Sequence, residues 1–224
     1  MIKQYFYITV LFCSFYNISS SQIELGVKGG YTNAWPDYGD LVLPEGAGTS
    51  INGFNVSVFV GKYFENGVGL SINPGFVKRG AACIPGWQPS FDGDAKVFLN
   101  YFELPIMIHK KIELGVWDLT MTPGLGYGLG YLGSARIQEE ITISGQTEIY
   151  EFPVGIGDEF SDTYLRYDHG FHFNLRLDKK LHKNHSIFLE SSYYHGMTDY
   201  DRFNPSKNRS LNLNIGFGYS FGKR

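Results

Sequence analysis

WDLTMTPGLGYGLGY, residues 117–131, is the stretch that decides the fold. Every odd position carries a large apolar side chain or proline, and every even position carries Asp118, threonine or glycine. A strict period of two over fifteen residues indicates a β-strand whose two faces meet different surroundings. One face is oily and the other is small and polar, which is typical of a strand that separates lipid from the lumen of a membrane barrel.

Seven further segments alternate in the same way. They are Ile23–Thr32, Gly53–Phe64, Val68–Arg79, Lys96–Lys110, Thr163–Asp178, Ser186–Met197 and Leu211–Phe221. After residue 22 no apolar run is long enough to cross a bilayer as a helix. Eight strands are an even count, as single-chain outer-membrane barrels require, and in hydrocarbon the first strand must pair with the last because unpaired backbone groups are costly there. The pattern therefore predicts an all-β, eight-stranded antiparallel up-and-down transmembrane barrel.

The joints between these segments alternate between short and long. Short joints fall at 65–67, 111–116 and 179–185, and the first of them contains the hairpin signal Asn66-Gly67. Long joints fall at 33–52, 80–95, 132–162 and 198–208. Short turns on one rim and long loops on the other are expected for a barrel with periplasmic turns and extracellular loops. Within 132–162 the piece 137–150 alternates again, so we expect a hairpin above the membrane that could contact a protein, a glycan or lipopolysaccharide.

The first residues have the layout of an export signal. Lys3 precedes the mostly apolar run 5–15, and small polar residues follow up to Gln22. We expect a signal peptide over 1–21 and a barrel domain over 22–224; the alternative, a membrane anchor, would need a longer apolar run. After cleavage Cys83 is the remaining cysteine, so we expect no intramolecular disulfide, and its role stays open.

The content of charged and aromatic residues indicates which partners are not expected and where the membrane interfaces fall. Charged residues make up 18% and the formal net charge is −3, with no cluster of Lys and Arg, so nucleic acid is not an expected partner. Aromatic residues make up 17%. Those near predicted strand ends are expected to form interfacial girdles. They are Tyr31, Tyr63, Phe64, Trp117, Tyr131, Tyr164, Tyr219 and Phe221.

Alternation also predicts which charged side chains point into the lumen. They are Glu24, Lys28, Glu103, Asp118, Arg166, Asp168, His172, Arg176 and Glu190. An eight-stranded barrel is only wide enough for side chains to fill, and isolated buried charges are costly, so we expect these groups to pair and fill the interior. A static plug is the simpler interpretation; a proton-sensitive gate through His172 is the alternative.

The sequence gives little indication of a catalytic site or a metal site. His185 and Ser186 are adjacent, but they fall in a short turn away from the outer leaflet, so we expect no enzyme and no cofactor. Alternation sends His169 outward while Asp168 and His172 point inward, which disfavours a metal site there. The long-loop rim carries Asp158, Glu159, Asp162, Asp199 and Asp201, which form a solvated acidic rim or, as the alternative, a calcium site.

From Gln22 onward the chain resembles the PorT-like outer-membrane β-barrel family of Gram-negative bacteria, barrels related in architecture to the OmpA and OmpX types. The residues that carry the resemblance are Gly26-Val27-Lys28-Gly29-Gly30, Tyr101-Phe102-Glu103-Leu104-Pro105-Ile106, Pro123-Gly124-Leu125-Gly126-Tyr127, Tyr167-Asp168-His169-Gly170, Tyr194-His195-Gly196-Met197 and Ile215-Gly216-Phe217-Gly218-Tyr219-Ser220-Phe221. The resemblance implies a barrel in the outer membrane, and the family's namesake is linked to a protein-secretion system.

The resemblance also implies folding by the barrel-assembly machinery. Tyr219 and Phe221 are the expected assembly signal, although Gly222, Lys223 and Arg224 follow where such barrels commonly end on an aromatic residue. The expected function is a non-enzymatic barrel with a filled lumen, surrounded by outer-membrane lipid and lipopolysaccharide, with a structural or partner-binding role. A narrow gated channel and a soluble carrier of the lipocalin type are the alternatives.

Overall fold

The computed structural model describes residues 21–39, 48–82, 93–143, 146–157, 159, 162–182, 184–203 and 205–222. The signal peptide expected over 1–21 falls almost wholly outside these residues, and Cys83 and Asp158 also lie outside them. Within the described part, no helix is both long and apolar enough to pass through a bilayer.

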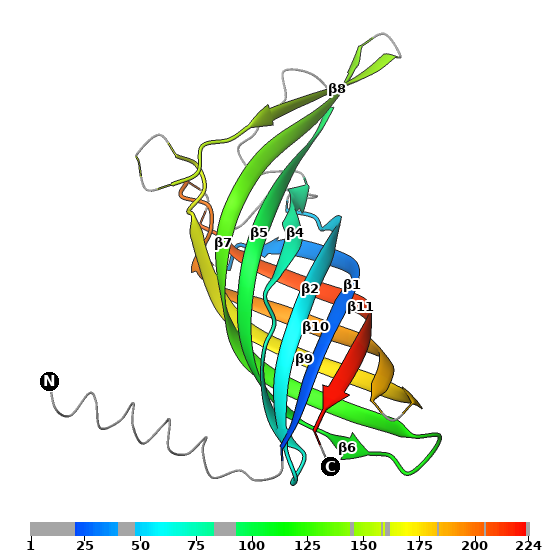
Figure 1. Cartoon of the computed structure of the whole chain (residues 1–224). Helices are drawn as coiled ribbons and strands as arrows, with labels where there is room; N and C mark the ends of the chain where they lie inside the picture. Colours follow the sequence, from blue (N-terminus) through cyan, green and yellow to red (C-terminus); the bar gives the residue numbers. More distant parts are fainter. Residues whose placement is uncertain are drawn as a thin grey trace, which may run out of the picture.

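The described chain is built from antiparallel strands that close into a ring (Figure 1). The strands are β1 (Ser21–Asp37), β2 (Ile51–Phe64), β3 (Val68–Ile72), β4 (Gly75–Ala82), β5 (Gly93–Lys110), β6 (Ile112–Glu113), β7 (Leu119–Ile143), β8 (Gln146–Pro153), β9 (Tyr167–His182), β10 (His185–Asp199) and β11 (Lys207–Phe221). The first and last strands pair from Ile23 with Phe221 to Asp37 with Lys207. This seam leaves no open edge around the ring, as the low polarity of hydrocarbon requires.

Strands β3 and β4 are two halves of one barrel strand. Both pair with β2 and with β5, and the register is the same on either side of Asn73 and Pro74. Pro74 has no backbone N–H to donate, so the ladder is interrupted there, although its carbonyl still accepts from Val58 (3.0 Å). With β3 and β4 counted together and the short β6 and β8 set aside, the ring has eight strands, which confirms the predicted fold class.

The two faces of the ring have opposite polarity. Aliphatic side chains point outward along every barrel strand, for example Val27, Ile106, Leu129 and Ile215, which are 50–65% exposed. The interior holds buried charged and amide side chains. An oily outer surface around a polar interior is the arrangement of a barrel immersed in lipid.

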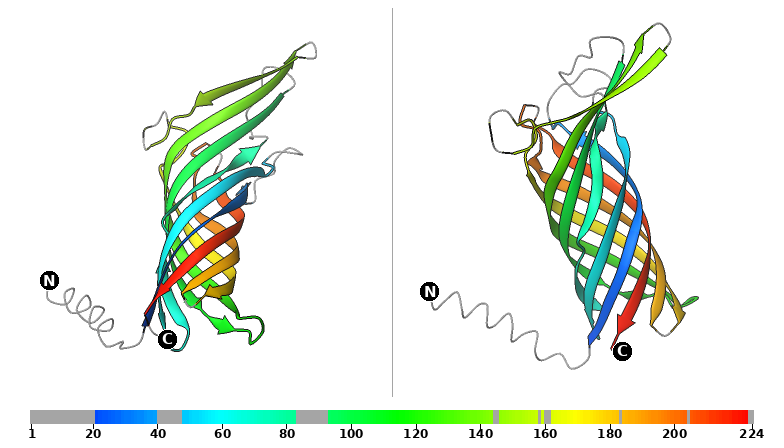
Figure 2. Two further views of the ribbon diagram at one scale, coloured as in Figure 1. Left: turned by 45° about the vertical axis from the view of Figure 1, so that its right-hand side comes forward. Right: turned by 45° about the horizontal axis from the view of Figure 1, so that its top comes forward.

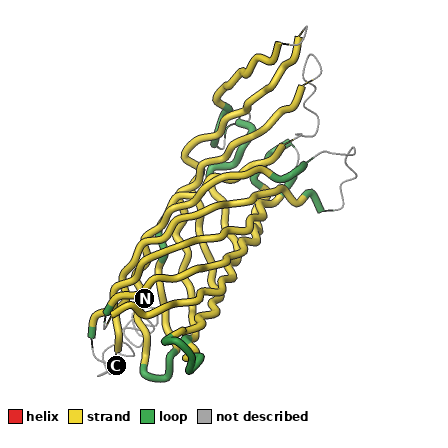
Figure 3. Tube along the Cα trace, turned by 90° about the vertical axis from the view of Figure 1, so that its right-hand side faces the viewer, coloured by secondary structure: helices red, strands yellow, loops and turns green. Residues whose placement is uncertain are grey.

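Two strands, β5 and β7, rise well beyond the rest of the barrel, and β8 adds to the edge of β7 (Figures 2 and 3). Strand β7 continues past Tyr131 through an irregularity opposite Asn100 and Tyr101, where Gly133 is an extra, unpaired residue. The pairs from Arg136 with Pro153 to Ile143 with Gln146 form a hairpin above the ring. A hairpin within 132–162 was expected, and this prediction is confirmed.

Several predicted positions are wrong. Trp117 and Asp118 lie in an exposed turn before β7, so Asp118 does not face the lumen. Arg166 lies before the start of β9, and its guanidinium donates to the Tyr131 hydroxyl (3.0 Å) and the Ile156 carbonyl (2.7 Å) instead. Tyr63 and Tyr164 are 3% and 2% exposed, so they pack inside and are not girdle residues. In each case the alternation was extended across a strand end or read on the wrong face.

Candidate functional site

The candidate site has two parts, the side chains that fill the interior and the hairpin above it. The interior receives seven of the nine predicted charged residues, namely Glu24, Lys28, Glu103, Asp168, His172, Arg176 and Glu190. They come from β1, β5, β9 and β10, so the ring closure brings together residues far apart in the sequence.

The layer nearest the short turns is a cluster of four charged groups. Arg176 Nη2 lies 2.5 Å from Glu24 Oε1 and 2.9 Å from Asp178 Oδ1, and Lys111 Nζ lies 2.5 Å from Glu24 Oε2. The Arg176 guanidinium also lies against the rings of Phe59 and Phe188, at 5.0 and 4.6 Å from their centroids. Two cations and two carboxylates therefore balance one another in a site with little access to solvent.

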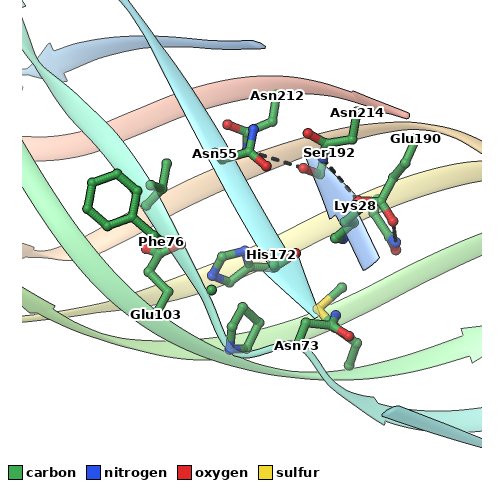
Figure 4. A pocket seen from close by; sticks show the side chains of 16 residues that line it. Lys28, Asn55, Asn73, Phe76, Glu103, His172, Glu190, Ser192, Asn212 and Asn214 are labelled. Carbon is green, nitrogen blue, oxygen red and sulfur yellow. Dashed lines mark hydrogen bonds and ion pairs between the residues drawn. The ribbon is translucent and has the colours of Figure 1, made fainter. Parts of the chain in front are cut away.

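The middle layer surrounds a small cavity of about 60 Å³ (Figure 4). Lys28 is ion-paired with Glu190, whose other oxygen accepts from the Asn174 amide nitrogen at 3.0 Å. The Asn214 amide nitrogen also donates to Glu190, at 3.3 Å. Several polar atoms that line the cavity, including His172 Nε2 and Ser57 Oγ, have no protein partner in the described structure. A cavity of this size and polarity has room for a few water molecules and is too small for an organic ligand.

The outer layer is centred on an arginine that the sequence analysis did not single out. Arg79 is fully buried; its Nη1 lies 2.5 Å from Glu103 Oε1 and its guanidinium lies 3.8 Å from the Tyr194 ring centroid. Asp168 accepts from the Asn208 amide nitrogen (2.8 Å) in the same layer. Arg79 stands at an inward position by simple alternation from Val77, so the signal was present in the sequence.

Above this layer the interior becomes apolar. Its core contains Val77, Ala81, Val97, Leu99, Tyr101, Leu132, Ala135, Ile137, Tyr164 and Tyr200, with Phe152, Val154 and Ile156 packed against it. The Tyr164 and Tyr200 rings stack with centroids 6.1 Å apart, and the Leu165 N–H donates to the Tyr200 carbonyl (2.9 Å). Burial raises the pKa of both phenols above the ordinary range, so they stay neutral. This core closes the outer mouth of the barrel.

The prediction of a solvated acidic rim is wrong for Asp201, which is 6% exposed and forms a β-bridge with Tyr164 of the apolar core. Asp201 is buried beside Tyr38, whose pKa is raised to about 12 by burial and by the Asp201 charge. Within the described residues no group of three or more His, Cys, Asp and Glu side chains is arranged to hold a metal ion. His185 and Ser186 lie at the first residues of β10, at the short-turn end.

The hairpin is the exposed part of the site. Strand β8 pairs with β7 along one edge, and no described strand pairs with its other edge. Ile149 and Tyr150 are 59% and 46% exposed on it. The hairpin carries four carboxylates, at Glu139, Glu140, Glu148 and Glu151. Two cations lie beside them: Lys96 pairs with Glu140 (2.7 Å), and Arg136 lies 3.9 Å from Glu151. The hairpin is therefore acidic and has an open strand edge.

The match to a protein family agrees with this architecture. Residues 15–202 match a family model described as "Outer membrane protein beta-barrel domain". No curated protein sequence matches the chain. Among solved structures, the chain is similar to Neisserial surface protein A (14% identity, 89% of this chain and 97% of that one, TM-score 0.47) and to OprG from Pseudomonas aeruginosa (14%, 89% and 96%, 0.44). It is also similar to Ail of Yersinia pestis, solved with a heparin analogue (18%, 89% and 99%, 0.41).

Proposed function

The chain belongs to the outer-membrane β-barrel family and resides in the bacterial outer membrane, and from this premise we propose that it is a non-enzymatic barrel that binds a protein partner through the hairpin of β7 and β8. The filled barrel holds the hairpin at the surface, and the hairpin makes the contact. A soluble carrier is excluded because the family is one of the outer membrane and because the outer face of the ring is apolar.

The observation that carries this proposal is the open edge of β8. An unpaired strand edge presents a row of backbone donors and acceptors that another extended segment can pair with. Proteins usually protect such edges, and β8 leaves Ile149 and Tyr150 exposed beside its edge. The carboxylates of the hairpin favour a partner whose extended segment carries Lys or Arg.

The filled interior supports a binding role over conduction. Three ion-paired layers and an apolar core follow one another along the axis, and two interior cavities lined by described residues have volumes of only about 60 and 50 Å³. We expect planar-bilayer recordings of the folded protein to show no conductance. Steady single-channel currents would favour the narrow gated channel instead.

We further propose that the partner takes part in protein secretion. The resemblance to PorT-like barrels supports a partner that belongs to a protein-secretion system, with the barrel as its outer-membrane component. The same resemblance supports Tyr219 and Phe221 as the signal for the barrel-assembly machinery.

Site-specific crosslinking in intact cells tests the proposal. A photo-crosslinking residue at Glu148, on β8, is expected to give a discrete protein adduct, while the same residue at Leu104, on the lipid-facing side of β5, is expected to give none. The double substitution Glu148→Arg and Glu151→Arg, with the crosslinker moved to Ile149, is expected to reduce the adduct at least several-fold because it reverses the charge of the edge.

The matched control reverses a carboxylate at the opposite end of the barrel. Glu113→Arg, in β6, is expected to leave the Ile149 adduct unchanged. Equal adducts from Ile149 and Leu104, or an Ile149 adduct that is insensitive to the charge reversal, would contradict binding at the β8 edge. Heat-modifiable migration in gels confirms that each variant is folded before it is scored.

A further inference from the structure

The short-turn end of the barrel carries an apolar projection that the lumen and the outer hairpin do not use. Strand β6 pairs with the start of β7, Ile112 opposite Met121, so Ile112 shares the outward face with Met121. Beyond it Leu114, Val116 and Trp117 are 39%, 56% and 82% exposed. These side chains continue the outward apolar face of β5 past Ile108, toward the periplasmic side on which such barrels have their short turns.

In this turn Trp117 adopts a left-handed backbone conformation that bulky residues disfavour. The Leu119 N–H donates to the Val116 carbonyl (3.1 Å), and the two central residues, Trp117 and Asp118, have φ angles of 52° and 53°. Such a turn favours Asn and Gly and disfavours a bulky side chain. The Lys179 ammonium donates to the Trp117 carbonyl and holds the turn beside β9. A tryptophan kept in this position is explained if its ring enters a favourable environment, and tryptophan favours the boundary between a membrane and water.

Three outward lysines lie at the same end of the barrel. Lys62, Lys110 and Lys179 each stand two residues beyond an outward aliphatic side chain, Val60, Ile108 and Leu177 respectively. Strand geometry places them on the lipid-facing side, one step past the apolar band, where lipid phosphates lie. Within the described residues none of the three forms a salt bridge, and Lys110 Nζ donates to the Asn66 carbonyl (2.5 Å). An ammonium has three donors, so donors remain for phosphate oxygens.

We propose that the β6–β7 turn, with Lys62, Lys110 and Lys179, forms a docking surface for the headgroups of anionic phospholipids in the inner leaflet of the outer membrane. The occupant follows from two observations, the continuity of the turn with the lipid-facing band and the charge of the three lysines. Of the exposed carboxylates at this end, Glu65 and Asp118 lie at the turn tips and Glu113 alternates to the face of β6 opposite Ile112, while the three lysines lie next to the band. This inference concerns the opposite end of the barrel from the proposed partner site and is independent of it.

Fluorescence of Trp117 tests the depth of the turn. The variant with Trp35→Phe and Trp87→Phe keeps Trp117 as its one tryptophan, because the chain has three. In phosphatidylcholine vesicles that contain phosphatidylglycerol, we expect strong quenching by lipids brominated near the headgroup and weak quenching by aqueous iodide. Iodide quenching as strong as that of free tryptophan would overturn the docking of the turn.

Spin-labelled lipids test the charge selectivity. At low salt the folded protein is expected to prefer labelled phosphatidylglycerol over labelled phosphatidylcholine, and each change among Lys62→Gln, Lys110→Gln and Lys179→Gln is expected to lower that preference about fivefold. Added salt should weaken the preference because the charges are exposed.

The chain offers a control lysine at the other end of the barrel. Lys207 stands opposite Asp37 at the long-loop end, so Lys207→Gln removes the same charge far from the β6–β7 turn. It is expected to leave lipid preference unchanged. Equal effects of Lys179→Gln and Lys207→Gln, or no preference in the unmodified protein, would overturn the proposal. Heat-modifiable migration shows that each single variant is folded before its lipid preference is scored.

Discussion

The barrel ring and the extension above it use the same two strands with opposite polarity. In the ring, β5 turns Leu104 and Ile106 outward and Glu103 and His109 inward. Above the ring, the same strand buries Val97 and turns Lys96 outward to pair with Glu140. The medium outside the sheet changes from lipid to water along β5, and the apolar face changes sides with it.

This difference means that the two regions are stabilised by different forces. Inside the ring, charged side chains are desolvated and depend on their partners, so loss of one partner leaves a buried charge uncompensated. In the extension, stability comes from apolar burial and close packing. Substitutions of the same kind should therefore have different effects in the two regions.

The largest effect is expected from removing one cation of the inner cluster. Arg176→Ala leaves Glu24 and Asp178 without their main partner and should lower the free energy of unfolding by about 3–5 kcal/mol. Urea titration of the protein in lipid vesicles measures this. Arg136→Ala, which breaks the exposed pair with Glu151 in the extension, should cost less than about 0.5 kcal/mol. Similar losses for the two variants would contradict the comparison.

Truncation of a leucine should destabilise the protein more in the outer core than on the lipid-facing side of the ring. Leu99 is fully buried in the outer core, and Leu99→Ala should lower the free energy of unfolding by about 2–5 kcal/mol. Leu104→Ala, on the lipid face of the same strand, removes side-chain area that faces lipid and leaves no cavity, so it should cost less than about 1 kcal/mol. The same urea titrations decide this prediction, and equal costs would show that the extension has no packed core.

A new charge on the outer face should destabilise the ring more than the extension. Ile106→Lys places an ammonium against acyl chains and should cost about 2–4 kcal/mol near the middle of the bilayer. Gln138→Lys, on the outward face of the extension, meets water and should be close to neutral. Folding efficiency and urea midpoints in vesicles measure both. A costly Gln138→Lys would mean that this face of the extension is covered.

The same change of medium explains what the sequence could and could not predict. The alternation of Trp117 to Tyr131 predicted a strand because one oily face persists over the height of the membrane. It predicted an end at Tyr131, and β7 instead continues to Ile143. Gly133 is unpaired, so inward residues are even-numbered before it, as in Leu132, and odd-numbered after it, as in Ala135 and Ile137. Beyond Gly133 the inward positions change from even to odd numbers and the inward face changes from polar to apolar. A single alternating pattern therefore cannot be followed from residue 117 to Ile143.

The errors in the candidate site have related causes. Alternation placed Glu24, Lys28, Arg176 and Glu190 in the interior because they lie within regular strands. Their partners were harder to find, since Lys111 follows the last residue of β5 and reaches back to Glu24 from a predicted turn. A strand pattern assigns a face to a residue, but it does not say which side chains meet across a ring, because closure and register are tertiary properties.

The smallest predicted effect lies at the outer end of the seam that closes the ring. Asp37, six residues beyond the lipid-facing Tyr31, accepts from the Gly39 N–H (3.0 Å), and Arg209 Nη2 lies 2.5 Å from its carboxylate. The Gly39 hydrogen bond, assisted by Arg209, lowers the pKa of Asp37 below its ordinary value. A lowered pKa means that the carboxylate stabilises the fold above about pH 4, the unfolded value, and that this contribution is lost as the pH falls further.

Because the Asp37 side chain is 41% exposed, solvent screens the pair and its contribution should not exceed about 1 kcal/mol. Asp37→Asn should therefore lower the unfolding free energy slightly at pH 7, and the difference from the unmodified protein should shrink between pH 4 and pH 2. Glu65→Gln, which removes an exposed carboxylate from a turn at the other end, is the control and should show no such difference at pH 7. A deficit in Asp37→Asn that is constant with pH would mean that the amide disturbs packing at the seam and that the charge of Asp37 contributes nothing.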